Sequence, residues 1–371
     1  MASRFAAYRA LMGFTCQAPV FALFYLSNGL DYRGLMTLAV VFAAAKLGCD
    51  VPAGVFADRF GRKKALLIRV ALEAVSVAIL FDRHFLISSA LAGAACAFSS
   101  GAEAAMVYEW NAKEFPKVFG RAASWGFLST ALAALAGGWL APVSFDLVYV
   151  LRLAALAAAG AVALGFEEPR RTGSRTAVKP VTAPPRRLVR IFVYVGLVGA
   201  VQVAALQLQQ PFLRSAGVPL ATLGALYVGF QVVTALGARI AHRVPRALRL
   251  IGLASTAGFA IMALPIGLAG ILGVLLLKFA HGVSLPTVGK SLSEGADPGS
   301  RATALSFRSL FEGAALALVA PALGWAADSV SLPSAFGLAA MFVGPSIVFS
   351  EVACVSLDSS ASPVSSVSSA A

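Results

Sequence analysis

The chain has 371 residues, of which 59% are hydrophobic and only 13% are charged, and its mean hydropathy is +0.82. A soluble protein of this length carries far more charge, so the composition indicates a polytopic membrane protein. The formal net charge of +13 does not indicate a nucleic-acid-binding surface, because the basic residues are spread over several short loops instead of lying with aromatic residues on one face.

Twelve apolar segments follow one another along the chain, each long enough to cross about 30 Å of hydrocarbon as a helix. Six of them precede a hydrophilic stretch and six follow it. The first six are predicted over residues 7–27, 35–57, 65–81, 86–108, 122–141 and 147–166, and the last six over residues 188–212, 221–241, 248–268, 271–289, 302–327 and 333–349. The predicted fold is therefore an all-α membrane protein with twelve transmembrane helices in two six-helix bundles.

The predicted domain organisation has four parts: an N-terminal bundle over residues 1–166, a cytoplasmic linker over 167–187, a C-terminal bundle over 188–355 and a tail over 356–371. The linker is rich in proline and arginine, which favours a flexible connection. The tail is rich in serine and alanine and is expected to be disordered.

A short internal repeat relates the two predicted bundles. The fifth segment contains Ala136-Gly137-Gly138-Trp139-Leu140-Ala141, and the eleventh contains Ala322-Leu323-Gly324-Trp325-Ala326-Ala327, about half a chain further on. Repeats of this length are typical of membrane proteins built by duplication of a six-helix unit.

The basic residues predict the topology, because cytoplasmic loops hold an excess of Lys and Arg. With both termini in the cytoplasm, most loop Lys and Arg lie on the cytoplasmic side, and only Arg33, Arg83 and Arg214 lie outside. The start of the chain lacks a convincing signal-peptide cleavage site, so residues 7–27 are expected to be the first span. The pattern predicts a multi-pass protein of the cell membrane, namely a bacterial inner membrane.

A dense cluster of charges lies between the second and third predicted spans. Residues 54–64 fit the pattern G-x-x-x-D-R-x-G-R-K-K, which resembles the signature loop between helices 2 and 3 of major facilitator superfamily (MFS) transporters. Residues 50–54, the stretch from Ser100 to Glu109 and residues 301–306 are similar to motifs of bacterial drug exporters of this family. The resemblance covers nearly the whole chain and implies the MFS fold. The fifth segment lacks the Gly-Pro pair of many proton antiporters in the family, so antiport is implied less firmly than transport.

We call residues 54–64 the signature loop. In the family, such a loop resembles a latch that holds the cytoplasmic side shut while the cavity faces outward. Its glycines are expected to allow close helix approach and unusual backbone angles, and its aspartate is expected to bond backbone amides or a neighbouring guanidinium. An ordinary positively charged cytoplasmic loop is the alternative. The residues assigned to the latch are Gly54, Asp58, Arg59, Gly61, Arg62, Lys63 and Glu109.

Several charged residues lie inside predicted spans, where an isolated charge costs a few kcal/mol. Three pairs stand at i, i+4 spacing on a common helix face and are expected to neutralise each other. These pairs are Lys46 with Asp50, Arg69 with Glu73, and Arg308 with Glu312.

Glu103 lies within the fourth predicted span and has no cation at i±3 or i±4. An unpaired carboxylate in apolar surroundings favours its neutral form, so Glu103 is the first candidate for proton coupling. An internal hydrogen bond to a serine or tyrosine on another helix is the alternative. Asp50, two helical turns from Asp58, is the second candidate.

The resemblance implies that helices 1, 4, 7 and 10 line a substrate cavity. The polar residues on helices 1, 7 and 10 that are candidates for contact with substrate are Gln17, Tyr25, Gln202, Gln207, Lys278 and His281. Lys278 and His281 share one helix face because they are three residues apart. The glutamines can alternatively hydrogen-bond between helices. Together with Glu103, these residues suggest a polar or zwitterionic organic substrate.

The sequence contains no nucleotide-binding or metalloprotease motif, and its cysteines show no zinc-site spacing, so we expect neither an enzyme nor a bound cofactor or metal. The predicted function is secondary active transport of a small organic solute by alternating access, with proton-coupled efflux by antiport favoured by the resemblance. A proton-coupled importer or a uniporter of the same fold, and a non-transporting scaffold or sensor, are the alternatives. The expected partners are a small-molecule substrate, protons and the lipid bilayer, with no nucleic acid, and we expect a monomer.

Overall fold

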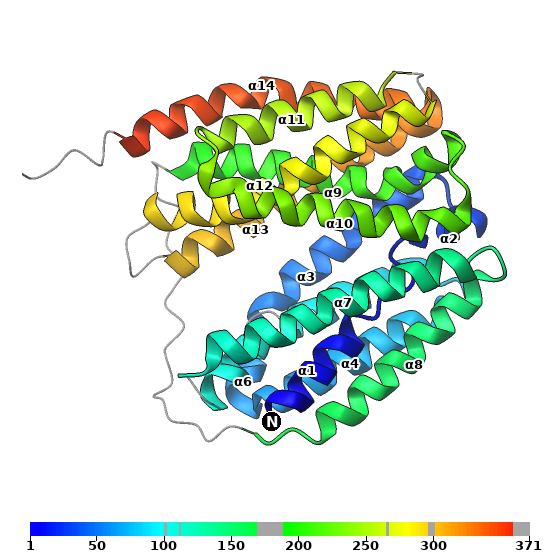
Figure 1. The fold of residues 1–371 in the computed structure, drawn as a ribbon, viewed down its shortest axis with the longest axis vertical. Coiled ribbons are helices and arrows are strands. Elements are labelled where there is room, and N and C mark those ends of the chain that lie inside the picture. The colour runs from blue at the N-terminus through cyan, green and yellow to red at the C-terminus, as the bar shows by residue number, and fades with distance from the viewer. Residues whose placement is uncertain (100–101, 111–112, 169–187, 265–266, 296–300, 359–371) are drawn as a thin grey trace, which may run out of the picture.

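The computed structural model describes residues 1–99, 102–110, 113–168, 188–264, 267–295 and 301–358. Its helices form two halves, with most of the N-terminal half in the lower part of Figure 1 and the C-terminal half in the upper part, whereas the short helix Phe21–Ser27, labelled α2, lies at the right beside the C-terminal helices. The N-terminal half contains α1 (Ala2–Gly13), α2 (Phe21–Ser27), α3 (Tyr32–Phe60), α4 (Arg62–Ala78), α5 (Phe85–Ser99), α6 (Ala102–Trp110), α7 (Phe115–Leu140) and α8 (Phe145–Leu164). The C-terminal half contains α9 (Val189–Ser215), α10 (Leu223–Ile240), α11 (Ala247–Met262), α12 (Ile271–Gly295), α13 (Arg301–Ser329) and α14 (Leu332–Asp358).

Eight helices in the described part of the chain are long and apolar enough to cross a membrane, and two shorter apolar helices, Ala247–Met262 and Leu332–Val348, accompany them. α4 carries Arg69 and Glu73 inside its span, and the first predicted span is interrupted. With these segments included, the helices occupy the twelve predicted positions. Large apolar side chains such as Leu318 (78% exposed) and Trp139 (75% exposed) point away from the protein, as expected for surfaces that face lipid.

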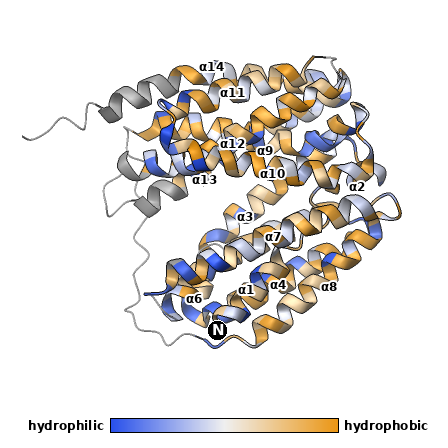
Figure 2. Cartoon of the chain, viewed as in Figure 1, coloured by the Kyte–Doolittle hydropathy of each residue, from blue (hydrophilic) through white to orange (hydrophobic). Residues whose placement is uncertain are grey.

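Hydrophobic residues cover most of the helix surfaces in Figure 2, whereas hydrophilic residues gather toward the helix ends. We name the two ends of the molecule. The basic end contains Ala2, the α3–α4 junction at Gly61 and the start of α9, and it lies at the left of Figure 1. The opposite end contains Asp31 and Ser329.

The first predicted span is not one continuous helix, which corrects the prediction for residues 7–27. α1 ends at Gly13 and α2 begins at Phe21, and short turns connect them. Pro19 explains the interruption, because proline has no amide hydrogen to donate and disfavours helical geometry in the residue before it. We call residues 14–20 the α1–α2 break.

The fourth predicted span corresponds to α5 and α6, and residues 100–101 between them lie outside the described residues. The end of the last span needs a correction. α14 continues to Asp358, beyond the predicted end at residue 349 and into the predicted tail. Most of the linker, at 169–187, and the rest of the tail, at 359–371, also lie outside the described residues.

Hydrogen bonds join the two halves at the opposite end. The carboxylate of Asp328 on α13 accepts from the backbone amides of Tyr32, at 3.0 Å, and Arg33, at 2.8 Å, at the start of α3. Asp328 therefore satisfies amides that have no partner within their own helix. The first turn of α3 and the last turn of α13 are held together by this carboxylate.

Glycines of the internal repeat also lie where the halves meet. A Cβ atom added to Gly138 on α7 would come within 2.6 Å of the backbone nitrogen of Gly224 on α10. A Cβ atom added to Gly324 on α13 would come within 3.0 Å of the Cα atom of Arg33 on α3. Both positions therefore require a residue without a side chain for the halves to approach this closely.

Candidate functional site

A cavity of about 750 Å³ lies between the two halves. We call it the central cavity. Most of its lining is apolar, and its polar side chains come from both halves, which is the usual composition of a site for a small organic molecule. Its polar and charged lining residues are Thr15, Gln17, Tyr25, Lys46, Glu73, Ser76, Ser88, Ser89, Tyr149, Gln207, Tyr227, Ser309 and Glu312.

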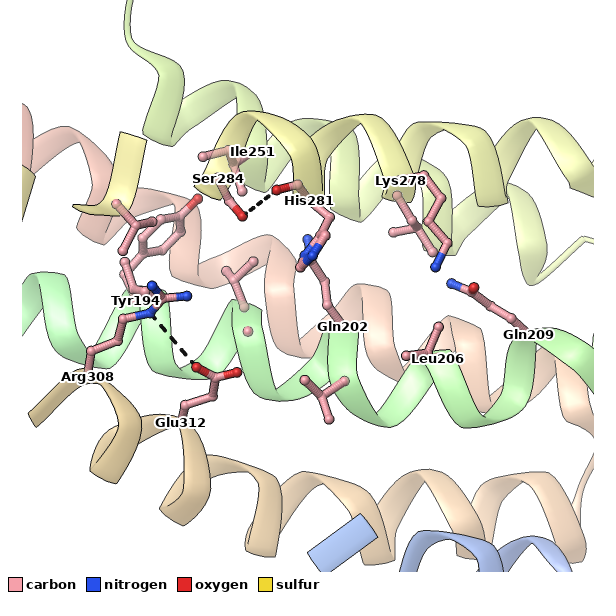
Figure 3. A pocket seen from close by; sticks show the side chains of 16 residues that line it. Tyr194, Gln202, Leu206, Gln209, Ile251, Lys278, His281, Ser284, Arg308 and Glu312 are labelled. Carbon is pink, nitrogen blue, oxygen red and sulfur yellow. Dashed lines mark hydrogen bonds and ion pairs between the residues drawn. The ribbon is translucent and has the colours of Figure 1, made fainter. Parts of the chain in front are cut away.

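A second, smaller pocket of about 120 Å³ lies within the C-terminal half. Figure 3 shows the side chains that line it. We call it the α9–α12 pocket, because Gln202 and Gln209 on α9 face Lys278 and His281 on α12 across it. Val203, Leu206 and Glu312 line both this pocket and the central cavity, so the two spaces share a wall.

The six predicted substrate residues divide between these two spaces. Gln17, Tyr25 and Gln207 line the central cavity. The remaining residues, Gln202, Lys278 and His281, line the α9–α12 pocket instead. The structure therefore does not bring all six residues into one space, although their contact with substrate stays a prediction.

The polar groups of the α9–α12 pocket form a short chain of contacts. Nδ1 of His281 lies 3.3 Å from Oε1 of Gln202, and Nε2 of Gln202 donates to Oγ of Ser255 at 2.9 Å. Lys278 points toward Gln209 in Figure 3. Gln202 therefore makes the interhelical contacts that the sequence left open as an alternative to substrate binding.

Glu103 is not isolated, which corrects the basis on which it was selected. Arg9 on α1 donates from Nη1 to Oε2 of Glu103 at 2.6 Å, and Arg69 on α4 donates to Oε1. The Glu103 side chain is only 7% exposed and lines neither of the two spaces described above. Both arginines are distant in sequence, so local spacing on one helix did not reveal them.

The predicted pairing of Arg69 with Glu73 is also wrong. Arg69 bonds to Glu103, and Glu73 bonds to Arg152 on α8. Glu73 additionally lines the central cavity. The other two predicted pairs are confirmed: Lys46 Nζ lies 2.9 Å from Asp50 Oδ2, and Arg308 Nε lies 3.9 Å from Glu312 Oε2.

Arg152 has a role that sequence reasoning missed. Its side chain is 1% exposed, and its Nη1 atom lies within 3.3 Å of the carbonyl oxygens of Leu11, Met12 and Phe14. These carbonyls stand at the end of α1, where the helix supplies few amides to pair with them, although the amide of Phe14 also donates to Leu11. A buried cation at a helix C-terminus also interacts favourably with the helix dipole. The signal in the sequence was an intramembrane arginine without an acidic residue at i±3 or i±4 on its own helix.

The α1–α2 break is held from the other half as well. Gln210 on α9 donates from Nε2 to the carbonyl oxygen of Ala18 at 2.8 Å, and its Oε1 accepts from the amide of Ala22 at 2.9 Å. Non-helical backbone is tolerated at membrane depth only where protein satisfies its polar groups. Gln210 and Arg152 meet this requirement from opposite sides of the break.

The signature loop has most of the predicted local contacts. Asp58 Oδ1 lies 2.6 Å from Nη1 of Arg62, and Nη2 of Arg62 lies 3.4 Å from Oε1 of Glu109. Gly61 has φ of +114°, a conformation that L-residues rarely adopt. Arg59 lies over the ring of Phe60, 5.4 Å from its centre.

Gly54 does not have the expected close helix contact. A Cβ atom added there would meet nothing within 4 Å. The side chain of Asp58 is 64% exposed. In this conformation the signature loop therefore contacts its own half, and its Gly54 and Asp58 positions face open space.

Glu168 was not predicted as part of the signature loop. Its carboxylate accepts from the backbone amide of Arg62 at 2.6 Å and from that of Lys63 at 3.0 Å. These are the first amides of α4, so Glu168 satisfies unpaired donors and complements the positive end of the helix dipole. A Cβ atom at Gly61 would come within 2.7 Å of this carboxylate. The sequence separation of more than a hundred residues hides this contact.

Comparison with solved structures identifies the fold. The chain superposes on the nucleoside transporter NupG with a TM-score of 0.76 and 15% identity, covering 95% of this chain and 98% of that one. A D-xylose-proton symporter gives a TM-score of 0.70 with 15% identity, at 94% and 96% coverage. A bacterial homologue of the human lysosomal transporter Spinster gives 0.65 with 15% identity, at 96% and 95% coverage.

Sequence comparison gives the family. No curated protein matches the chain by sequence. The sequence profile described as Major Facilitator Superfamily matches residues 5–318, which is most of the chain. The twelve helical positions, the two halves and the similarity to solved transporters agree with that match. The chain is an integral multi-pass membrane protein that belongs to the major facilitator superfamily of transporters.

Proposed function

We propose that the protein moves a small polar organic solute across a membrane by alternating access. The observation that carries this proposal is the central cavity, whose volume of about 750 Å³ suits a small molecule and whose walls come from both halves. Rocking of one half against the other would expose such a cavity first to one side and then to the other. We further propose that the transporter works as a monomer.

The conformation described here is, in this proposal, closed at the opposite end and open toward the basic end. Asp328 and Gln210 bond the two halves together near the opposite end. At the basic end, Asp58 is largely exposed and Gly54 has open space beside it. We propose that the basic end faces the cytoplasm of a bacterial cell, with both termini on that side, because an excess of Lys and Arg favours the cytoplasmic side.

The signature loop acts as the predicted latch in the alternate state. When the basic end closes, the C-terminal half approaches the loop and contacts Gly54 and Asp58, which face open space here. The Asp58–Arg62–Glu109 chain of ion pairs then supplies charges for that contact. The latch residues are thus expected to matter for the transport cycle more than for folding.

We assign proton coupling to Glu312, a carboxylate that lines the space proposed for the solute. Glu312 lines both the central cavity and the α9–α12 pocket, and its ion pair with Arg308 is long, at 3.9 Å. Lys46 from α3 and Glu73 from α4 also line the central cavity, each with its own ionic partner. Glu312 is therefore the carboxylate most available to exchange a proton. Asp50, held by Lys46, is retained as the second candidate.

Two coupling mechanisms are open: antiport of solute against protons, and symport of solute with protons. Export in exchange for protons is what the sequence resemblance to drug exporters implies. Movement of solute and protons in the same direction is the action of one structural relative, the D-xylose-proton symporter. The two mechanisms move protons in opposite directions relative to the solute, so one measurement separates them.

The test is flux in proteoliposomes with an imposed pH gradient, using a panel of drugs, amino acids, sugars, nucleosides and organic acids. Counterflow identifies a transported solute without any gradient. A pH-sensitive dye inside the vesicles then reports whether solute and protons move in the same or opposite directions. Liposomes without protein control for leakage. Absence of counterflow for the whole panel would favour a non-transporting scaffold or sensor and overturn the proposal.

A further inference from the structure

The charged side chains that line the two spaces are almost all paired. Lys46 pairs with Asp50, Glu73 pairs with Arg152, and Glu312 pairs with Arg308. Lys278 also lines the α9–α12 pocket. Among the described residues, it is the charged lining side chain that has no ion pair and no hydrogen bond.

Lys278 is placed where an unpaired charge is costly. It lies in α12, inside the candidate span Gly267–Leu292, and a lone cation within a span costs a few kcal/mol. Arg308, which also lines the pocket, is balanced by the carboxylate of Glu312. In the described part of the chain, the pocket thus has an excess of positive charge and no fixed group to balance it.

The neighbours of Lys278 are neutral hydrogen-bonding groups. Gln209 is buried, being only 7% exposed, and its amide points toward the Lys278 ammonium in Figure 3. Ser284 and Gln202 lie further along the same pocket. A carboxylate placed between Lys278 and Gln209 would accept from the ammonium and from the amide nitrogen, and both bonds involve a charged group, which strengthens them.

The α9–α12 pocket lies next to the central cavity, where the transported solute is proposed to bind. Val203, Leu206 and Glu312 form a common wall with the central cavity. The pocket has a volume of about 120 Å³, which suits one small functional group of a solute and not its whole body. The aromatic residues Phe21 and Tyr25 line the central cavity, next to this pocket, where the rest of the solute would lie.

We propose that the α9–α12 pocket binds a carboxylate of the transported solute, with Lys278 as its counter-ion and Gln209 as its amide partner. This inference rests on the proposed transport function and specifies the chemical class of solute as organic acids, including zwitterionic ones. A dianionic phosphate fits less well, because Arg308 is already engaged by Glu312 and Lys278 carries a single charge.

The test uses matched pairs of acids and primary amides in the counterflow assay. The probes are 3-phenylpropionate with 3-phenylpropionamide, N-acetylphenylalanine with its amide, and phenylalanine with phenylalaninamide, alongside the neutral sugars and nucleosides of the wider panel. The proteins are wild type, Lys278→Gln, Lys278→Arg and the control Lys117→Gln, which changes an exposed lysine on α7. We expect acids to be transported in preference to their amides, at least tenfold weaker acid transport in Lys278→Gln, and partial recovery in Lys278→Arg.

Thermal stability without solute gives a second readout. If Lys278 is kept for solute, Lys278→Gln protein should be at least as stable as wild type, since an uncompensated charge is removed. A clear loss of stability would assign Lys278 to the fold and overturn the proposal. Equal transport of the acids by wild type and Lys278→Gln, or equal transport of acids and their amides by wild type, would overturn the carboxylate subsite alone. Absence of all counterflow would instead reject transport itself.

Discussion

Gln210 on α9 donates a hydrogen bond to the carbonyl oxygen of Ala18, 2.8 Å away, in the α1–α2 break of the other half. The same side chain accepts from the amide of Ala22. One residue of the C-terminal half thus completes the backbone bonding of the N-terminal half. Opening of the opposite end has to break both bonds, which makes Gln210 part of the outer closure in the proposed cycle.

Gln210→Leu is expected to loosen this closure. The substitution keeps most of the side-chain volume but leaves a carbonyl and an amide unpaired, at a cost of about 1–3 kcal/mol. Amide hydrogen exchange in a peptide covering residues 14–27 should accelerate by about tenfold, because about 1.4 kcal/mol corresponds to that factor. Thr222→Val, at the same end of the molecule, is the control. Unchanged exchange in Gln210→Leu protein would show that the bonds do not hold the break.

Asp58→Asn and Gly61→Val are each expected to abolish transport. Asparagine loses the charge that pairs with Arg62, and valine cannot easily adopt φ of +114° or fit beside the carboxylate of Glu168. Membrane abundance of Asp58→Asn should stay near that of wild type, because the side chain is 64% exposed. Counterflow and quantitative immunoblotting measure the two quantities. Asp82→Asn, an exposed aspartate near the opposite end, is the control, and full activity of both loop variants would remove the latch assignment.

Glu103→Gln and Glu312→Gln are expected to differ in their effect on pH dependence. Glu103 balances Arg9 and Arg69, so Glu103→Gln leaves two cations without their carboxylate and should lower stability and abundance. Glu312 lines both spaces, and its ion pair with Arg308 is long. Glu312→Gln should therefore flatten the pH profile of transport. Transport rates from about pH 5 to 8 check this. A flattened profile in Glu103→Gln with a normal profile in Glu312→Gln would reverse the assignment.

Arg152→Gln is expected to destabilise the protein more than Glu73→Gln does. Removal of one member of a buried ion pair costs about 3–5 kcal/mol. Arg152→Gln also deprives the carbonyls at the end of α1 of their donor, whereas Glu73→Gln leaves those bonds in place. Thermal denaturation in detergent, followed by size-exclusion chromatography, compares the two variants. Equal losses would mean that the carbonyl contacts contribute little.

The sequence predicted those features that depend on local pattern. Hydrophobic length located the twelve helical positions, and spacing on one helix found the pairs Lys46 with Asp50 and Arg308 with Glu312. The signature loop was recognised from its glycines and charges. Each of these signals lies within one continuous stretch of the chain, and the two ion pairs lie within about one helical turn, where neighbours in sequence are also neighbours in space.

Contacts between distant segments escaped prediction. Glu103 was selected because it had no nearby cation, yet Arg9 from α1 and Arg69 from α4 both reach it. Glu168 binds the start of α4 across more than a hundred residues. The α1–α2 break was missed because residues 7–27 are predominantly apolar, although Pro19 marked the interruption.

The equivalent glycines of the internal repeat, Gly138 and Gly324, each pack against backbone of the partner half. If the two halves arose by duplication of a six-helix unit, one ancestral small residue would have supplied both of these close contacts between the halves. A side chain introduced at either glycine would separate the halves at that contact and leave the other contact intact. The halves would therefore tilt relative to each other instead of moving apart evenly. The central cavity would then widen more on the side of the substituted glycine than on the other.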